Sequence, residues 1–60
     1  MIIGIIGFGS IGERHFHNVR KLYPKFKINI LTKRKLPAYK NTEVFYSEKD
    51  FFGELNDVFF

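Results

Sequence analysis

The pattern of apolar residues changes twice in the first half of the chain. The run Ile2–Ile6 contains no polar residue, which is typical of a central parallel strand buried on both faces. Over Ser10–Leu22 the apolar residues instead recur at helical spacing, which predicts a helix that ends before Pro24. The next apolar stretch, Lys27–Leu31, predicts a second strand.

The predicted helix has one side that we expect to pack on a sheet and one that we expect to face solvent. The sheet-facing positions are Ile11, His15, Val19 and Leu22. The opposite side carries Glu13, Arg14, Asn18, Arg20 and Lys21. Strand, helix and second strand together have the length of a βαβ unit, which is about 30 residues.

The second half of the chain predicts shorter elements. Thr32–Thr42 is polar, basic and interrupted by a proline, and we expect a loop there. A short strand is predicted over Glu43–Tyr46. Ser47 is expected to cap a helix over Glu48–Leu55, with Phe51, Phe52 and Leu55 facing the sheet. A fourth strand is expected to begin within Asn56–Phe60.

A glycine-rich loop, Gly7–Gly12, lies between the first predicted strand and the first predicted helix. This spacing in this context is typical of a site for the pyrophosphate of a dinucleotide, because the turn directs backbone N–H groups and a helix N-terminus at the anion. Cofactor contacts are therefore expected from Gly7, Phe8, Gly9, Ser10, Ile11 and Gly12. The alternative is an ordinary glycine-rich turn between a strand and a helix.

The three glycines are expected to have separate roles. Gly7 allows the tight turn, Gly9 keeps a side chain away from the pyrophosphate, and Gly12 lets the helix approach the sheet. Together with the alternation of strands and helices, they predict an α/β fold: a partial Rossmann-type doubly wound parallel sheet, β-α-β-loop-β-α-β, truncated in its fourth strand. We expect residues 1–60 to be the N-terminal portion of a dinucleotide-binding domain, with the C-terminal substrate domain absent from this chain.

The net charge of the chain is +4, and no acidic residue lies between Glu13 and Glu43. Such a basic block is found in proteins that bind nucleic acid. The cations here are spread over a helix face, a strand end and a loop, without the aromatic platform of a single-strand binder. We therefore favour a solvated face or a site for cofactor phosphates, and we expect no nucleic-acid partner.

The residues after the second strand bear on the choice of cofactor. Many NAD sites carry an acidic residue there, about 20 residues past the loop, which binds the adenosine ribose. This chain has Thr32, Lys33 and Arg34 instead. A hydroxyl and a guanidinium suit a 2′-phosphate, so NADP is favoured over NAD. Two alternatives stay open: ordinary exposed loop cations, or an arginine that stacks on adenine and serves both cofactors.

Other site chemistry is limited by composition. The chain has no cysteine, which excludes disulfides and thiolate metal sites. His15 and His17 point in different directions on a helix, and we interpret them as surface or packing residues, with no metal bound. No apolar run approaches the roughly 18 residues of a membrane span. We expect a cytoplasmic protein with no membrane partner.

The run Ile5–His15, together with the Asp57-Val58 pair at the start of a later strand, resembles the N-terminal part of the glucose–fructose oxidoreductase/inositol dehydrogenase/rhizopine-catabolism (Gfo/Idh/MocA) family. The resemblance covers the whole chain. It implies an NAD(P)-dependent oxidoreductase acting on a sugar or cyclitol, and the short loop after Arg34 is similar to members associated with bacterial surface-polysaccharide synthesis.

The same resemblance places the family's catalytic residues beyond Phe60, so no catalytic residue is expected in this chain. It also implies a homo-oligomer and a sugar-type substrate for the full-length protein. A second function class stays open, since the same βαβ unit occurs in regulatory modules that sense nucleotides without catalysis. A Glu-Lys-Pro segment on a later strand would favour the enzyme over the sensor.

Overall fold

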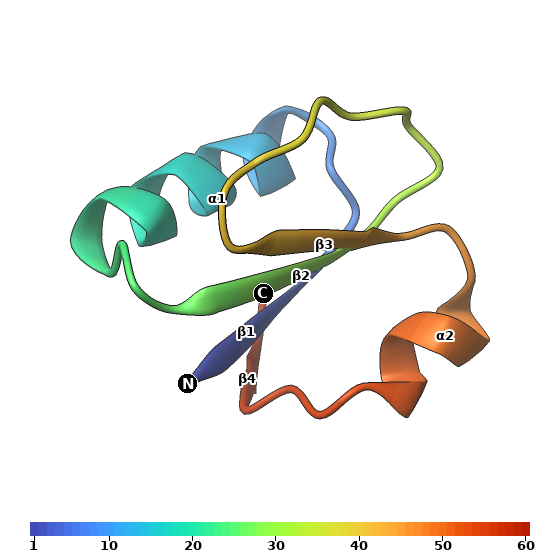
Figure 1. The fold of residues 1–60 in the computed structure, drawn as a ribbon. Helices are drawn as coiled ribbons and strands as arrows, with labels where there is room; N and C mark the ends of the chain where they lie inside the picture. The colour runs from blue at the N-terminus through green and yellow to red at the C-terminus, as the bar shows by residue number, and fades with distance from the viewer.

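The computed structural model describes residues 1–60 and has the element order β1 (Ile2–Ile6), α1 (Ser10–Leu22), β2 (Lys27–Leu31), β3 (Thr42–Phe45), α2 (Glu48–Gly53) and β4 (Val58–Phe59). The strands form one parallel sheet in the order β3-β2-β1-β4 (Figure 1). The predicted α/β class and parallel sheet are therefore confirmed. Neither helix is long and apolar enough to cross a membrane.

Most predicted boundaries are confirmed, and two are wrong by one or two residues. The third strand begins and ends one residue earlier than predicted, because Asn41 turns in the left-handed region (φ 55°) and Thr42 then pairs with Ile28. The second helix ends at Gly53, not Leu55, since glycine is a poor helix former and Glu54 is extended. Ser47 caps this helix as predicted, its hydroxyl accepting a hydrogen bond from the Asp50 N–H at 3.4 Å.

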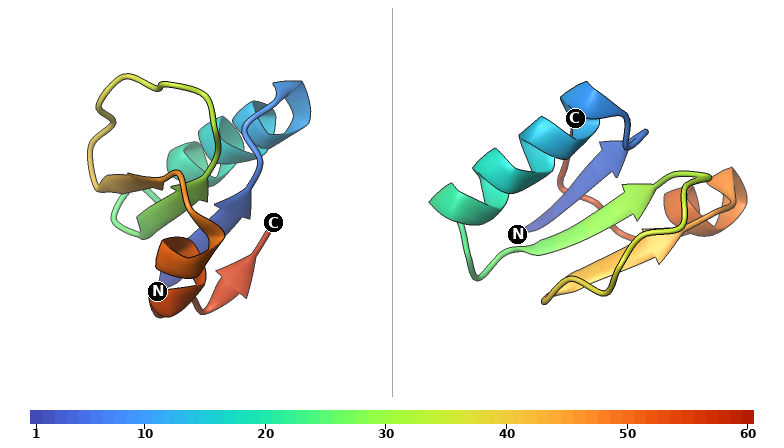
Figure 2. Two further views of the ribbon diagram at one scale, coloured as in Figure 1. Left: turned by 90° about the vertical axis from the view of Figure 1, so that its right-hand side faces the viewer. Right: turned by 90° about the horizontal axis from the view of Figure 1, so that it is seen from above.

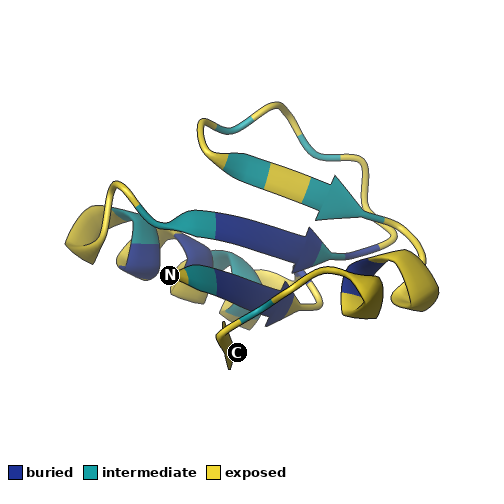
Figure 3. Cartoon of the chain, turned by 60° about the horizontal axis from the view of Figure 1, so that its bottom comes forward, coloured by how far each residue is buried: buried dark blue, intermediate teal, exposed yellow.

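The helices cover opposite faces of the sheet (Figures 1 and 2). The α1 face holds the main core, in which Phe16 and Val19 pack on alternate residues of the two central strands: Ile3, Ile5, Ile28 and Ile30. Figure 3 shows the buried residues concentrated in β1 and β2, while β4 is exposed. The neighbouring strands β1 and β2 therefore form the buried centre of the sheet, and the loops begin at their ends.

The sheet-facing side of α1 differs from the prediction. Ile11 and Leu22 are 69% and 70% exposed and His15 is also exposed, so only Val19 of the predicted stripe is buried. The helix is rolled so that Gly12 and Phe16 face the sheet. Gly12 sets this roll because it lies directly against the β1–α1 turn, where no larger residue fits.

The α2 face is smaller and depends on the absence of a side chain in the middle of β1. A Cβ at Gly4 would lie 3.0 Å from Phe51 Cζ and 2.9 Å from Asn56 Oδ1. Phe51 is fully buried there, whereas Phe52 and Leu55 are 54% and 76% exposed, against the prediction that all three face the sheet. A helix of six residues presents only one large side chain to the sheet.

Arg20 joins the end of α1 to the beginnings of two strands. Its guanidinium donates hydrogen bonds of 2.7–3.1 Å to the carbonyl oxygens of Pro24, Phe26, Lys40 and Asn41 and to Oγ1 of Thr42. The four carbonyl groups precede β2 and β3, and Thr42 is the first residue of β3. The interpretation of Arg20 as part of the solvent-facing side is therefore wrong, because its side chain reaches over the strand ends.

We expect Arg20→Gln to lower the free energy of unfolding by about 2 kcal/mol, since several carbonyl oxygens lose a charged donor. Arg14→Gln, on the same helix but at an exposed position, is the matched control and should change stability by less than about 0.5 kcal/mol. Urea unfolding followed by circular dichroism measures both. Equal losses in the two variants would contradict the anchoring role.

Candidate functional site

An open cleft lies at the carboxyl end of β1, between the loop that follows this strand, the start of α1 and Phe60, the residue after β4. The chain passes from β1 through α1 to β2 on one face, and from β3 through α2 to β4 on the other. The neighbours β1 and β4 are thus reached by connections on opposite faces. In open α/β sheets, ligands bind at the carboxyl ends of strands where the winding reverses in this way.

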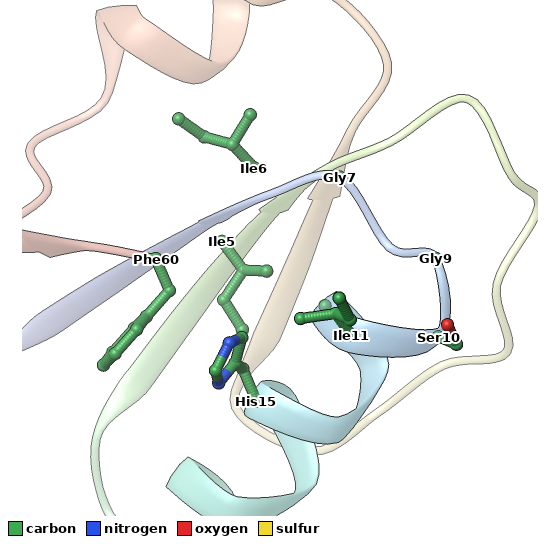
Figure 4. A pocket seen from close by; sticks show the side chains of 9 residues that line it. Ile5, Ile6, Gly7, Gly9, Ser10, Ile11, His15 and Phe60 are labelled. Carbon is green, nitrogen blue, oxygen red and sulfur yellow. The ribbon is translucent and has the colours of Figure 1, made fainter.

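The cleft has a volume of about 480 Å³ and is lined by Ile5, Ile6, Gly7, Gly9, Ser10, Ile11, Gly12, His15 and Phe60. Figure 4 shows the loop passing over it from β1 into α1. Five of the six residues predicted from the glycine-rich loop therefore line one cavity. The exception is Phe8.

The three glycines are required for three different reasons. Gly7 has a φ of +82°, a conformation that side-chain-bearing residues rarely adopt. A Cβ at Gly12 would lie 2.3 Å from the carbonyl oxygen of Gly7, so only glycine lets α1 approach the turn this closely. A Cβ at Gly9 would meet nothing within 4 Å. No contact inside the chain explains glycine at this position, and the free space lies beside the cleft.

Backbone donors gather at the same place. Gly9 is the N-cap of α1, and its carbonyl accepts the first helical hydrogen bond, from the Glu13 N–H at 2.8 Å. The N–H groups of Ser10, Ile11 and Gly12 precede that bond and have no carbonyl partner within the helix. No side chain caps them. The cleft therefore offers aligned donors and the positive end of a helix dipole to an anion.

Phe8 does not present its side chain to the cleft. The ring is 2% exposed and packs against Phe16 and Tyr39, with centroid separations of 5.6 and 6.4 Å. Phe8 therefore anchors the loop in the core, and only its backbone is available nearby. Its carbonyl oxygen accepts a hydrogen bond from the Arg34 guanidinium.

The three residues predicted after β2 have different environments. Thr32 is 7% exposed, and its Oγ1 accepts a hydrogen bond from the Arg34 N–H at 3.1 Å, so the hydroxyl shapes the turn. Lys33 is exposed. Arg34 reaches back to the glycine loop, where its Cζ lies 5.8 Å from the centroid of the Phe8 ring. Only Arg34 of the three therefore contacts the loop.

Two residues near the site were missed by the sequence reasoning. Glu13 was assigned to a solvent-facing side, but its Oε1 lies 3.6 Å from Arg34 Nη1. His15 lines the cleft, and its ring stacks on that of Phe60 with centroids 5.5 Å apart and planes at 24° (Figure 4). The position of His15 could have indicated its role, because it lies one helical turn after Ile11, which was predicted to contact the cofactor. Nothing in the sequence paired Glu13 with Arg34, which is 21 positions away.

Comparisons of the chain with models of protein families, with curated proteins and with solved structures found no match. No group of three or more His, Cys, Asp or Glu side chains is placed to hold a metal ion.

We expect Gly12→Ala to lower the free energy of unfolding by about 1–3 kcal/mol, because the added methyl group overlaps a backbone carbonyl that cannot rotate away. Gly9→Ala is the matched control: its methyl group enters free space, and stability should change by less than about 1 kcal/mol. Thermal unfolding of both variants tests the difference. A more stable Gly12→Ala protein would show that the close approach is not required.

Proposed function

We propose that the cleft binds the pyrophosphate of a nicotinamide dinucleotide, and that the chain is the N-terminal NAD(P)-binding part of a Rossmann-type oxidoreductase. The observation that carries the proposal is the position of Gly9. It stands at the start of α1, beside the cleft at the reversal of the sheet, and no neighbouring atom accounts for its missing side chain.

The arrangement of donors supports a pyrophosphate in particular. The N–H groups of Ser10, Ile11 and Gly12 belong to the first turn of a helix of 13 residues, whose dipole favours negative charge at this end. The walls of the cleft are largely apolar, with Ile6 and Ile11 beside the loop. An elongated ligand that combines phosphates with flat apolar rings suits this surface.

The topology is compatible with the proposed fold. The strand order of the sheet, β3-β2-β1-β4, equals that of the first four strands of the doubly wound dinucleotide-binding sheet. Two of the three connections run through helices, which lie on opposite faces, and the third, from β2 to β3, is a loop. The glycine loop follows β1, where such sheets place the pyrophosphate.

The proposed reaction is the oxidation or reduction of a sugar or cyclitol carbon in surface-polysaccharide synthesis. It is supported by the resemblance of the run Ile5–His15 to the Gfo/Idh/MocA family. The only titratable side chain that lines the cleft is His15, and it is stacked on Phe60. We therefore propose no catalytic residue here and assign the chain a binding role. A protein containing it that binds the dinucleotide without any hydride transfer would instead be a nucleotide sensor.

For the cofactor we propose NADP, with NAD as the alternative. The support is a guanidinium beside the loop, with Lys33 and Lys35 exposed on either side of Arg34 and no acidic residue between β2 and β3. Thr32 does not add to this support, because it is buried and its Oγ1 accepts a hydrogen bond within the turn.

We expect Gly9→Val to reduce the affinity for NADP and for NAD at least tenfold, about 1.4 kcal/mol, because a branched side chain fills the space left for the phosphates. Isothermal titration calorimetry of both proteins measures the change, with Gly53→Val, at a glycine remote from the cleft whose Cβ also meets nothing within 4 Å, as the control. Unchanged affinity in Gly9→Val would place the nucleotide elsewhere or exclude it.

We expect NADP to bind about ten- to a hundredfold more tightly than NAD, because the hydrogen bonds of a guanidinium to a phosphate contribute about 1.5–3 kcal/mol. Arg34→Gln should remove most of this margin and leave NAD binding nearly unchanged. Lys25→Gln, which removes an exposed cation at the other end of the sheet, is the control. Equal binding of NADP and NAD by the unaltered chain would contradict the NADP assignment and favour stacking on adenine.

A further inference from the structure

We infer that Glu13 is a specificity-determining residue that competes with the 2′-phosphate of NADP for Arg34. The inference rests on the proposed function and assigns a role to a carboxylate that the loop motif leaves undefined. It follows from the placement of one acidic side chain in the first turn of α1, directly beside the guanidinium that is proposed to bind the phosphate.

The guanidinium has two partners at the loop. Nη1 of Arg34 donates to the Phe8 carbonyl oxygen, and the same atom lies 3.6 Å from Oε1 of Glu13. The backbone bond fixes where the guanidinium sits, because Phe8 is held in the core by its buried ring. The Glu13 carboxylate makes only an ion-pair contact with the guanidinium, because 3.6 Å is longer than a good hydrogen bond.

The Glu13 contact is weak enough to be displaced. The Arg34 and Glu13 side chains are 57% and 43% exposed, and exposed pairs of this kind contribute little to stability. The second carboxylate oxygen lies 3.7 Å from Nε2 of His17, so a displaced Glu13 keeps a neighbour. A phosphate offers three acceptor oxygens and up to two negative charges. It would therefore replace the Glu13 carboxylate as the partner of the Arg34 guanidinium.

The Glu13 carboxylate weakens the binding of NADP and not that of NAD. A 2′-phosphate bound to Arg34 stands close to the Glu13 carboxylate and is repelled by it, and the positive charge of Arg34 is already shared with that carboxylate. NAD has no 2′-phosphate and meets neither effect. Glu13 therefore narrows the preference for NADP that Arg34 creates, and its removal should widen that preference.

The test is Glu13→Gln, which keeps the size of the side chain and removes its charge. The affinities for NADP and NAD are measured by isothermal titration calorimetry at one fixed low salt concentration. We expect NADP to bind about three- to tenfold more tightly than to the unaltered chain, from loss of a weak ion pair and of a like-charge contact, with NAD changed less than about twofold. An unchanged or reduced ratio of NADP to NAD affinity overturns the inference.

Two controls separate this effect from net charge and from folding. Glu54→Gln removes the same charge on the α2 side of the sheet and should leave the ratio unchanged; an equal gain there would mean that net charge alone is responsible, which overturns the inference. The double variant Glu13→Gln/Arg34→Gln should lose the gain, as coupled residues do in a double-mutant cycle. A gain that survives without Arg34 also overturns it.

The same titrations distinguish failure of the proposed function from failure of the role inferred for Glu13. If the unaltered chain binds neither NADP nor NAD, the proposed function fails, and the inference with it. If both bind and their ratio does not respond to Glu13→Gln, the dinucleotide site stands and only the competition is refuted. The amide NMR spectrum of each variant verifies that the fold is retained.

Discussion

The contact between Gly12 and the carbonyl oxygen of Gly7 is the constraint on which the rest of the structure depends. With only 2.3 Å available for a Cβ, α1 touches the turn that follows β1 and can lie on the sheet in one orientation. That orientation turns Phe16 and Val19 into the core and directs the helix N-terminus at the cleft. The packing of α1 and the candidate site therefore both follow from the absence of a side chain at Gly12.

The strands, the first helix and the loop were predictable because each depends on local pattern: an apolar run, a helical repeat, and glycines at fixed spacing. The roll of α1 was not, since Ile11 and Leu22 are as apolar as Val19 and only the backbone contact at Gly12 decides which of them is buried. Phe52 illustrates the same limit, because its exposure follows from the shortness of α2.

The partners of the charged side chains were the least predictable feature, because long side chains contact residues that are far away in the sequence. The basic block of the sequence contains Arg20, which is held by carbonyl oxygens, and Arg34, which pairs with Glu13. Lys27 likewise pairs with Glu43, at 3.2 Å. The acidic residues at the two ends of the block therefore fold back onto it. The charge available to a ligand is set by these pairings, and residue counts alone overstate it.

The central claim is that the loop after β1 binds the phosphates of a dinucleotide. The most direct measurement is the change in amide chemical shifts of the ¹⁵N-labelled chain when NADP is added. The account predicts that the largest changes fall on the N–H groups of Ser10, Ile11 and Gly12, where the unpaired donors of α1 meet the cleft. A second pocket lies on the α2 side, beside Asp50 and Glu54. Chemical-shift changes centred on that pocket, or no changes at high nucleotide concentration, would contradict the account.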